Sequence, residues 1–278
     1  GKPSIRCATH RGTFVDTLKW LAVWWLMPWT AVCSAEETVN PPGDPGEFHL
    51  YLLMGQSNMA GRGAVSEDVV APERVLKLTA EMKWAPASDP IHFDKPQIAG
   101  AGPGSGFGPA MAEADEGVTI GLIPCAFGGT PLSRWVKGGD LYENAVKRTR
   151  AAAKQGTLKG VIWHQGESDS GEEELAETYA ERLYGMIGDL RDDLKLPDLP
   201  VVVGELGEFL QTERYPYAGA VNRALEELPE QVSNTAFVDA EGLTAKSDEV
   251  HFDAESCREF GKRYARAMLE LQAESDEE

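Results

Sequence analysis

Three residues of the kind that build a nucleophilic site lie in two short polar segments, one early in the chain and one late. Ser57 lies in the segment 55–61 (GQSNMAG), and Asp248 and His251 lie in the segment 248–253 (DEVHFD). A serine hydroxyl is a weak nucleophile until a base removes its proton. A histidine can do this near neutral pH, and a neighbouring carboxylate orients the ring and stabilises its charged form. The pattern therefore predicts Ser57 as the nucleophile, His251 as its base and Asp248 as the orienting carboxylate.

Each of these residues also has another interpretation. Ser57 could simply cap a helix that follows a glycine-rich turn. Asp253 could orient His251 in place of Asp248, or it could begin the last helix of the chain. We prefer His251 as the base because it combines a flanking carboxylate with a position in a loop before a helix. The other histidines that follow the N-terminal segment, His49, His92 and His164, lack this combination.

Two further segments could hold the negative charge that forms on an ester oxygen during acyl transfer. Gln165 lies in the segment 163–169 (WHQGESD), and its side-chain amide could donate a hydrogen bond to this oxyanion. Gly128 and Gly129 follow an apolar run, and a glycine there lets a backbone N–H approach the same oxygen. We favour Gly128 over Gly129, although both glycines could merely form a strand-to-helix turn.

These segments follow short apolar runs that alternate with helical stretches. Short continuous apolar strands separated by helices predict a parallel sheet with helices on both faces, which is a three-layer, doubly wound α/β domain. The carboxyl ends of parallel strands meet at one edge of the sheet, where such domains place their sites. Residues 61–107 are less regular and are expected to form loops around the site. The expected strands are 49–54, 118–124, 158–163, 199–203 and 235–238, and the expected helices are 108–114, 141–155, 172–193, 215–228 and 254–272.

The composition limits the partners that the protein can have. A length of 278 residues fits one large α/β domain or two small ones, and 42% hydrophobic residues suffice for a core. The formal net charge of -19 argues against nucleic acid as a partner, because phosphates need Lys and Arg, and it disfavours anionic membrane surfaces. Cys125 and Cys257 are expected to be free, buried thiols, with a disulfide as the alternative.

The N-terminal segment differs from the rest of the chain. Basic residues precede the apolar run 20–33 (WLAVWWLMPWTAVC), and small residues follow it. This order predicts a signal peptide over residues 1–35, and therefore a secreted or periplasmic protein without a membrane anchor after cleavage. A buried amphipathic helix and a retained anchor are the alternatives. We expect a linker at 36–46, the main domain at 47–273 and an acidic tail at 274–278.

Four blocks of the sequence together resemble the SGNH hydrolase superfamily. Within it, the chain is most similar to the carbohydrate esterases that include acetyl-xylan esterases and sialate O-acetylesterases. The resemblance extends over about residues 48–270. The blocks that carry it are GQSNMAGRG (55–63), IPCAFGGTPLSRW (123–135), WHQGESDS (163–170) and DEVHFDAESCREFGKRYA (248–265).

The resemblance implies a flavodoxin-like α/β/α fold and the removal of acetyl groups from carbohydrates without a metal or another cofactor. It implies a Ser57, His251 and Asp248 triad, and an oxyanion hole made by the backbone N–H groups of Ser57 and Gly128 and by Gln165. Acetylated carbohydrate would be the partner. Gln56, Asn58 and Glu167 would support the site, and Arg134 and Trp135 would line the cleft or only pack.

Three other functions stay open at this point. The chain could be a short-chain esterase, a lipase or a thioesterase with another substrate, or a sugar-binding module without catalytic activity. It could also be a glycosidase that uses paired carboxylates such as Glu167 and Glu205. The acyl chain-length preference, the presence of ester cleavage and the release of reducing sugar would separate these functions from the first.

Overall fold

A seven-stranded sheet forms the centre of the computed structural model, which describes residues 37–210 and 212–277. The strand order is β3-β2-β4-β1-β5-β6-β7, and β3 is antiparallel to β2 while the other neighbours are parallel. The strands are β1 (Phe48–Gly55), β2 (Val75–Leu78), β3 (Trp84–Pro86), β4 (Thr119–Pro124), β5 (Thr157–His164), β6 (Val201–Gly204) and β7 (Thr235–Val238).

The five strands expected from the sequence are β4, β1, β5, β6 and β7 in their order across the sheet. Numbered along the chain, this is the order 2-1-3-4-5 of flavodoxin-like domains. The prediction of a doubly wound α/β fold is therefore confirmed, and the sheet is mixed rather than purely parallel. The sequence did not predict β2 and β3, since strands of four and three residues are too short to produce a clear periodicity.

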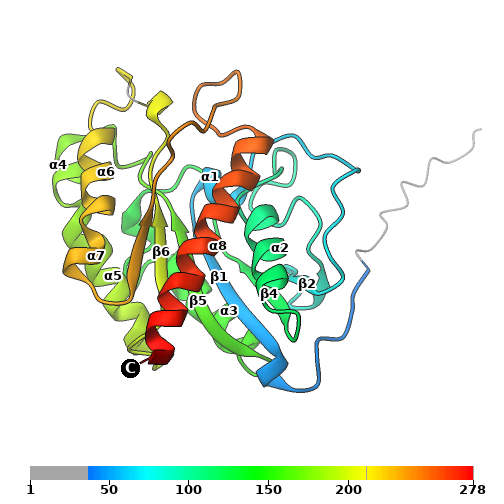
Figure 1. Cartoon of the computed structure of the whole chain (residues 1–278). Helices are drawn as coiled ribbons and strands as arrows, with labels where there is room; N and C mark the ends of the chain where they lie inside the picture. The colour runs from blue at the N-terminus through cyan, green and yellow to red at the C-terminus, as the bar shows by residue number, and fades with distance from the viewer. Residues whose placement is uncertain (1–36, 211, 278) are drawn as a thin grey trace, which may run out of the picture. The chain divides into compact units, whose positions relative to one another are not determined.

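Helices cover both faces of the sheet (Figure 1). Helices α2 and α8 pack side by side on one face, and α3, α5 and α6 contribute to the core on the other. The α-helices are α1 (Ser57–Ala60), α2 (Gly104–Ala114), α3 (Asp140–Ala152), α4 (Glu173–Glu177), α5 (Tyr179–Leu194), α6 (Ala218–Glu226), α7 (Leu228–Gln231) and α8 (Ala254–Glu277). Three 3-10 turns are η1 (Pro45–Glu47), η2 (Leu132–Arg134) and η3 (Glu208–Leu210).

Strand β1 lies in the middle of the sheet and is buried on both faces. Its side chains alternate, so that Leu50 and Leu52 join the core under α3 and α5, while Tyr51 and Leu53 join the core under α2 and α8. This burial explains why the strand is a continuous apolar run rather than an alternating one. A central strand held from both sides is a rigid base for the turn that follows it.

The two cysteines of the main domain are free and buried, as expected. Cys125 belongs to the core on the α3 side, whereas Cys257 belongs to the core on the α8 side. The sheet lies between these two cores, so the two thiols cannot meet.

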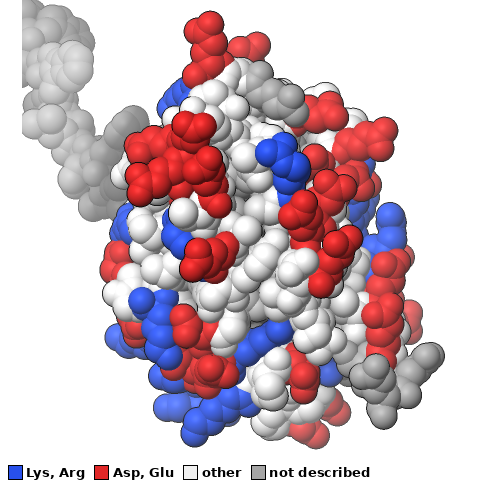
Figure 2. Space-filling model, turned by 90° about the vertical axis from the view of Figure 1, so that its left-hand side faces the viewer, with Lys and Arg blue, Asp and Glu red and all other residues white. Residues whose placement is uncertain are grey.

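The surface of the described residues is rich in acidic groups. Figure 2, which views the molecule from the side of α4 and α6, shows several groups of acidic side chains, with basic side chains gathered toward the lower end. No helix in the described ranges is long and apolar enough to cross a membrane. The predicted signal peptide lies outside the described residues.

Candidate active site

The turn after β1 presents Ser57 at the start of the short helix α1. Gly55 ends the strand with φ of +133°, and a Cβ at this position would collide with the backbone carbonyl of His164 on β5. Only glycine tolerates both the dihedral angle and this close approach. Gln56 ties the turn to β5, because its N–H donates to His164 O at 2.9 Å and its side-chain oxygen accepts the N–H of Ser168 at 3.2 Å. The turn that carries Ser57 is thus held against the end of β5.

Ser57, His251 and Asp248 form a continuous chain of contacts. His251 Nε2 lies 3.0 Å from Ser57 Oγ, and His251 Nδ1 lies 2.9 Å from Asp248 Oδ2. The other oxygen of Asp248 accepts the N–H groups of Val250 at 3.0 Å and of His251 at 2.9 Å. With Asp248 accepting at Nδ1, the proton of a neutral ring lies on that nitrogen, and Nε2 faces the serine as an acceptor.

The electrostatic environment favours a neutral imidazole and a charged carboxylate. Burial lowers the pKa of His251; Asp248 opposes this shift, while Arg62 and Lys246 add to it. Burial would raise the pKa of Asp248, but the hydrogen bonds from the side chain and backbone of His251 and from Val250 hold that pKa well below its usual range. At neutral pH the ring can therefore take a proton, and the carboxylate can stabilise the imidazolium that results.

Asp253 has a different role from Asp248. Its side chain accepts the N–H of Ser256 at 2.8 Å and contacts the hydroxyl of Thr244. The first of these bonds is an N-terminal cap for α8, where backbone N–H groups lack partners within the helix. Of the two carboxylates that the sequence allowed, Asp248 is the one that contacts the ring of His251.

Asn58 connects the serine turn to the histidine loop. Its side chain accepts the N–H of Phe252 at 3.1 Å and donates to Val250 O at 3.1 Å and to Glu167 Oε1 at 2.6 Å. Glu167 is buried, and its Oε2 has no hydrogen-bond partner in the described part of the chain. Burial raises the pKa of Glu167 to about 7, and the bond from Asn58 opposes this shift.

Gln165 is not placed as the sequence led us to expect. The side chain is fully buried, and its Nε2 donates to Thr130 O at 3.0 Å and to Asp169 Oδ2 at 2.6 Å. An amide nitrogen has two protons, so both are used. Asp169 also accepts the N–H of Leu132 at 2.8 Å. Gln165 therefore joins the loops after β4 and β5, and the expectation that it donates to an oxyanion does not fit this geometry.

Gly128 lies beside Ser57, but its N–H is also engaged. A Cβ at Gly128 would contact Ser57 Cβ at 3.3 Å and would collide with Arg62 Nη2. The Gly128 N–H donates to Asp94 Oδ2 at 2.8 Å, and this carboxylate forms a buried ion pair with Arg62 at 2.7 Å. The backbone of Gly128 therefore approaches Ser57 closely, as expected, but its N–H already donates to Asp94 and is not free to donate to an oxyanion.

Ser57 and His251 border a cavity of about 440 Å³ at the carboxyl edge of the sheet. Most of its lining residues are polar or charged, and Ile98 and Val250 are the aliphatic members. Arg134 and Trp135 do not line it, because Arg134 pairs with Asp140 and Trp135 is fully buried. The residues that line the cavity are Gln56, Ser57, Arg62, Lys95, Ile98, Gly128, Gly129, Glu167, Ser168, Gly171, Arg214, Tyr215, Val250 and His251.

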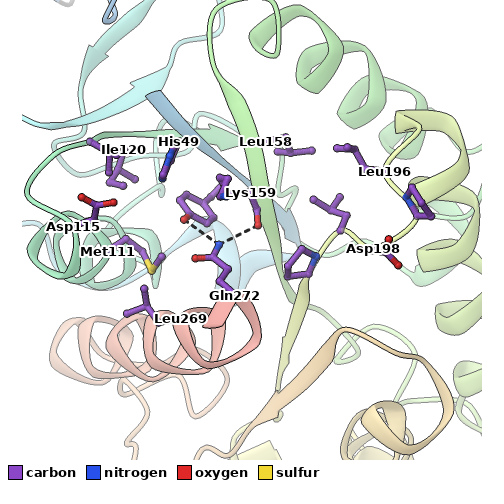
Figure 3. A pocket seen from close by; sticks show the side chains of 15 residues that line it. His49, Met111, Asp115, Ile120, Leu158, Lys159, Leu196, Asp198, Leu269 and Gln272 are labelled. Atoms are coloured by element: carbon purple, nitrogen blue, oxygen red, sulfur yellow. Dashed lines mark hydrogen bonds between the residues drawn. The ribbon is translucent and has the colours of Figure 1, made fainter. Parts of the chain in front are cut away.

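A second cavity of about 410 Å³ lies at the opposite ends of the strands (Figure 3). His49 lines it, and Gln272 at the end of α8 donates to the hydroxyl of Tyr51 and to Lys159 O. None of the predicted site residues lines this cavity. Within the described residues, no group of three or more His, Cys, Asp or Glu side chains is arranged to hold a metal ion.

Two residues next to the triad were not predicted from the sequence. Arg62 lies within the block 55–63 that carried the resemblance, so the sequence contained a signal for it. Asp94 lies in the irregular region 61–107, where neither periodicity nor a motif distinguishes it from other aspartates. Its importance follows only from its contacts with Arg62 and Gly128.

Comparison with known proteins adds an independent line of evidence. The family model described as carbohydrate esterase, sialic acid-specific acetylesterase, matches residues 47–270. A probable carbohydrate esterase of Arabidopsis thaliana is 38% identical over 255 residues, which are 83% of this chain and 93% of that protein. The chain belongs to this carbohydrate esterase family. The esterase is accordingly an acetylesterase and a member of the SGNH group, as the sequence motifs predicted.

Solved structures agree with the fold of the esterase. The X-ray structure of the Arabidopsis thaliana protein superposes with a TM-score of 0.74 at 34% identity, over 81% of this chain and 99% of that one. NanS superposes with a TM-score of 0.65 at 20% identity, over 83% and 99% of the two chains. A carbohydrate acetylesterase from Xanthomonas citri gives 0.61 at 19% identity, over 82% of this chain and 57% of that one.

Proposed function

We propose that the esterase removes O-acetyl groups from carbohydrates through a Ser57–His251–Asp248 triad and an acetyl-enzyme intermediate. The observation that carries the proposal is the 3.0 Å contact between Ser57 Oγ and His251 Nε2 beside a cavity lined mostly by polar and charged residues. Two segments separated by 194 residues meet there as a proton-transfer pair. Such a pair converts a weakly nucleophilic hydroxyl into one that can attack an ester.

In the first half-reaction, Ser57 Oγ forms a bond to the acetyl carbonyl carbon, and its proton passes to His251 Nε2. The electrons of the carbonyl double bond move onto its oxygen. The Ser57 N–H, which has no acceptor within the described part of the chain, is available to donate to that oxygen. The bond to the sugar oxygen then breaks, and His251 returns its proton to that oxygen, so the sugar leaves as an alcohol.

In the second half-reaction, water attacks the acetyl group on Ser57 and gives a proton to His251. The bond between the acetyl carbon and Ser57 Oγ breaks, and the same proton returns to Oγ. Acetic acid leaves and ionises to acetate by releasing its proton to water, and the free enzyme is restored. Asp248 keeps its charge throughout, because it accepts from His251 Nδ1 in both half-reactions.

The cavity favours a short acyl group and a polar alcohol. A lipase or a long-chain thioesterase needs an apolar channel for the acyl chain, whereas the lining here includes charged and amide groups. A glycosidase that pairs Glu167 with Glu205 is also disfavoured. Glu205 does not line the cavity, and its carboxylate accepts the N–H of Ala240 at 2.8 Å.

The decisive experiment compares the wild-type esterase with Ser57→Ala and His251→Ala. Acetate release from p-nitrophenyl acetate and from a panel of acetylated glycans should fall by several orders of magnitude in both variants. Activity on p-nitrophenyl esters should also decrease as the acyl chain lengthens. Full activity in purified, folded Ser57→Ala would refute the triad, and a preference for long chains would refute the substrate class.

A further inference from the structure

The proposed reaction needs more hydrogen-bond donors for the oxyanion than the predicted groups provide. Gln165 uses both of its amide protons within the protein. The Gly128 N–H donates to Asp94. Of the three donors that the sequence suggested, only the Ser57 N–H is left without an acceptor in the described ranges. Acyl-transfer sites usually hold the oxyanion with several donors fixed in advance, so another group at this edge of the sheet is expected to contribute.

Arg62 is a charged donor that lies close to Ser57. Its Nη2 occupies the space that a side chain at Gly128 would need, and Ser57 Cβ borders the same space at 3.3 Å. Arg62 lines the cavity together with Ser57 and His251. The absence of a side chain at Gly128 is what allows the guanidinium to lie so close to the serine.

Hydrogen bonds fix the guanidinium of Arg62 in this place. Nη1 donates to Gly61 O at 2.7 Å and contacts Asp94 Oδ1 at 3.4 Å, while Nη2 donates to Asp94 Oδ2 at 2.7 Å. The two side chains are 4% and 0% exposed, so the pair is shielded from water. These bonds use one of the two N–H groups of Nη2, which leaves the second one for a ligand.

We propose that Arg62 is a catalytic residue of the esterase that donates from Nη2 to the oxyanion, and that Asp94 is the positioning residue that holds it. This inference rests on the proposed acyl-transfer function. When the Ser57 Oγ bond to the carbonyl carbon forms, negative charge develops on the oxygen, and a charge-assisted hydrogen bond from Arg62 strengthens at that moment. The same contact stabilises the uncharged carbonyl of the bound substrate less than it stabilises the oxyanion. It therefore raises the rate of the reaction rather than the affinity for the substrate.

The test uses steady-state kinetics of Arg62→Met on p-nitrophenyl acetate. We expect kcat to fall by about 10²–10³-fold with little change in KM, the effect of losing one oxyanion donor. Arg191→Met is the matched control, because both arginines are 7% exposed. Among the residues that the structure describes, Arg191 bonds only to backbone oxygens of Leu199, Ser233 and Asn234. This control should lose stability but keep its kcat.

Two readouts separate a donor from a merely structural residue. Added guanidinium ion, at concentrations too low to unfold the protein, should restore part of the kcat of Arg62→Met and leave Arg191→Met unchanged. The acid limb of kcat/KM should also move to higher pH in Arg62→Met. Asp248 raises the pKa of His251, whereas the charges of Arg62 and Lys246 lower it. Loss of the Arg62 charge should therefore raise the pKa of His251.

Arg62→Lys keeps the experiment decisive if Arg62→Met does not fold. The ammonium group retains the charge, but it cannot donate to Asp94 in two directions and also reach the oxyanion, so kcat should fall at least tenfold. Wild-type kcat in either folded variant would overturn the proposal. The proposal would also be overturned if kcat fell in folded Arg62→Met and added guanidinium ion did not restore any of it. These outcomes leave the triad standing, whereas activity in Ser57→Ala would remove the basis for both proposals.

Discussion

Asn58, which follows the proposed nucleophile Ser57, joins three segments of the candidate site. Asn58 donates both of its amide protons, to Val250 and Glu167, and accepts from Phe252, so one side chain connects the ends of β1 and β5 to the histidine loop. These bonds hold the loop that carries His251 against the turn that carries Ser57, where the two side chains lie 3.0 Å apart. Sequence motifs identify such residues, but the direction of each hydrogen bond follows only from the packed structure.

Glu167 should make the stability of the esterase depend on pH. Its pKa is raised from 4.5 to about 7 by burial, so the folded state holds a proton that the unfolded chain has lost. This stabilisation is complete below pH 4.5 and disappears as the pH rises through about 7. The shift corresponds to roughly 3 kcal/mol of unfolding free energy.

Glu167→Gln tests this expectation, since the amide cannot ionise and keeps an oxygen that can accept from Asn58. Urea unfolding at pH 5 and pH 8 should show that the variant gains stability relative to the wild type as the pH rises. Other titrating groups contribute equally to both proteins and cancel in the difference. A difference between the two proteins that stays constant with pH would contradict the proposed protonation of Glu167.

At the scale of elements, helix α8 and the histidine loop are connected through the cap at Asp253. The bond to the Ser256 N–H satisfies one free donor at the start of a helix that packs along α2. His251 lies two residues before the cap. The position of the proposed base is therefore coupled to the start of the longest helix in the described chain.

Asp253→Ala should lower the unfolding free energy by about 1 kcal/mol, the usual effect of losing a cap. Asp253→Asn, which can still accept the hydrogen bond, should lose much less. Both variants should keep most of the wild-type kcat below their unfolding temperatures, because Asp248 orients His251. Thermal unfolding and steady-state kinetics provide the two measurements. A large loss of kcat in folded Asp253→Asn would reassign the orienting role to Asp253.

At the scale of the whole molecule, the net charge of -19 must weaken the folded state through repulsion among acidic groups. Raising the NaCl concentration from about 0.01 M to about 0.1 M shortens the screening length from roughly 30 Å to roughly 10 Å. The temperature of half-unfolding near pH 8 should then rise by a few degrees. The same titration near pH 5, close to the pI of 4.7, should have a much smaller effect. A fall in this temperature at pH 8 would mean that attractive ion pairs dominate.

The sequence alone determined the family, five of the seven strands and the three triad candidates. Apolar runs are local patterns, so they can be recognised in the sequence. A parallel sheet brings the carboxyl ends of its strands to one edge, independently of the conformation of the loops. The short strands β2 and β3 escaped prediction because their positions depend on pairing, of β2 with β4 and of β3 with β2, rather than on a local pattern.

Only the tertiary structure decided which groups are available to the oxyanion. Gln165 looked like a donor in its own segment, but Thr130 and Asp169 take both of its protons. Arg62 looked like an ordinary basic residue until Asp94, 32 positions away, fixed its guanidinium beside Gly128. Hydrogen-bonding capacity is a property of a residue type, whereas its use depends on the partners that folding supplies.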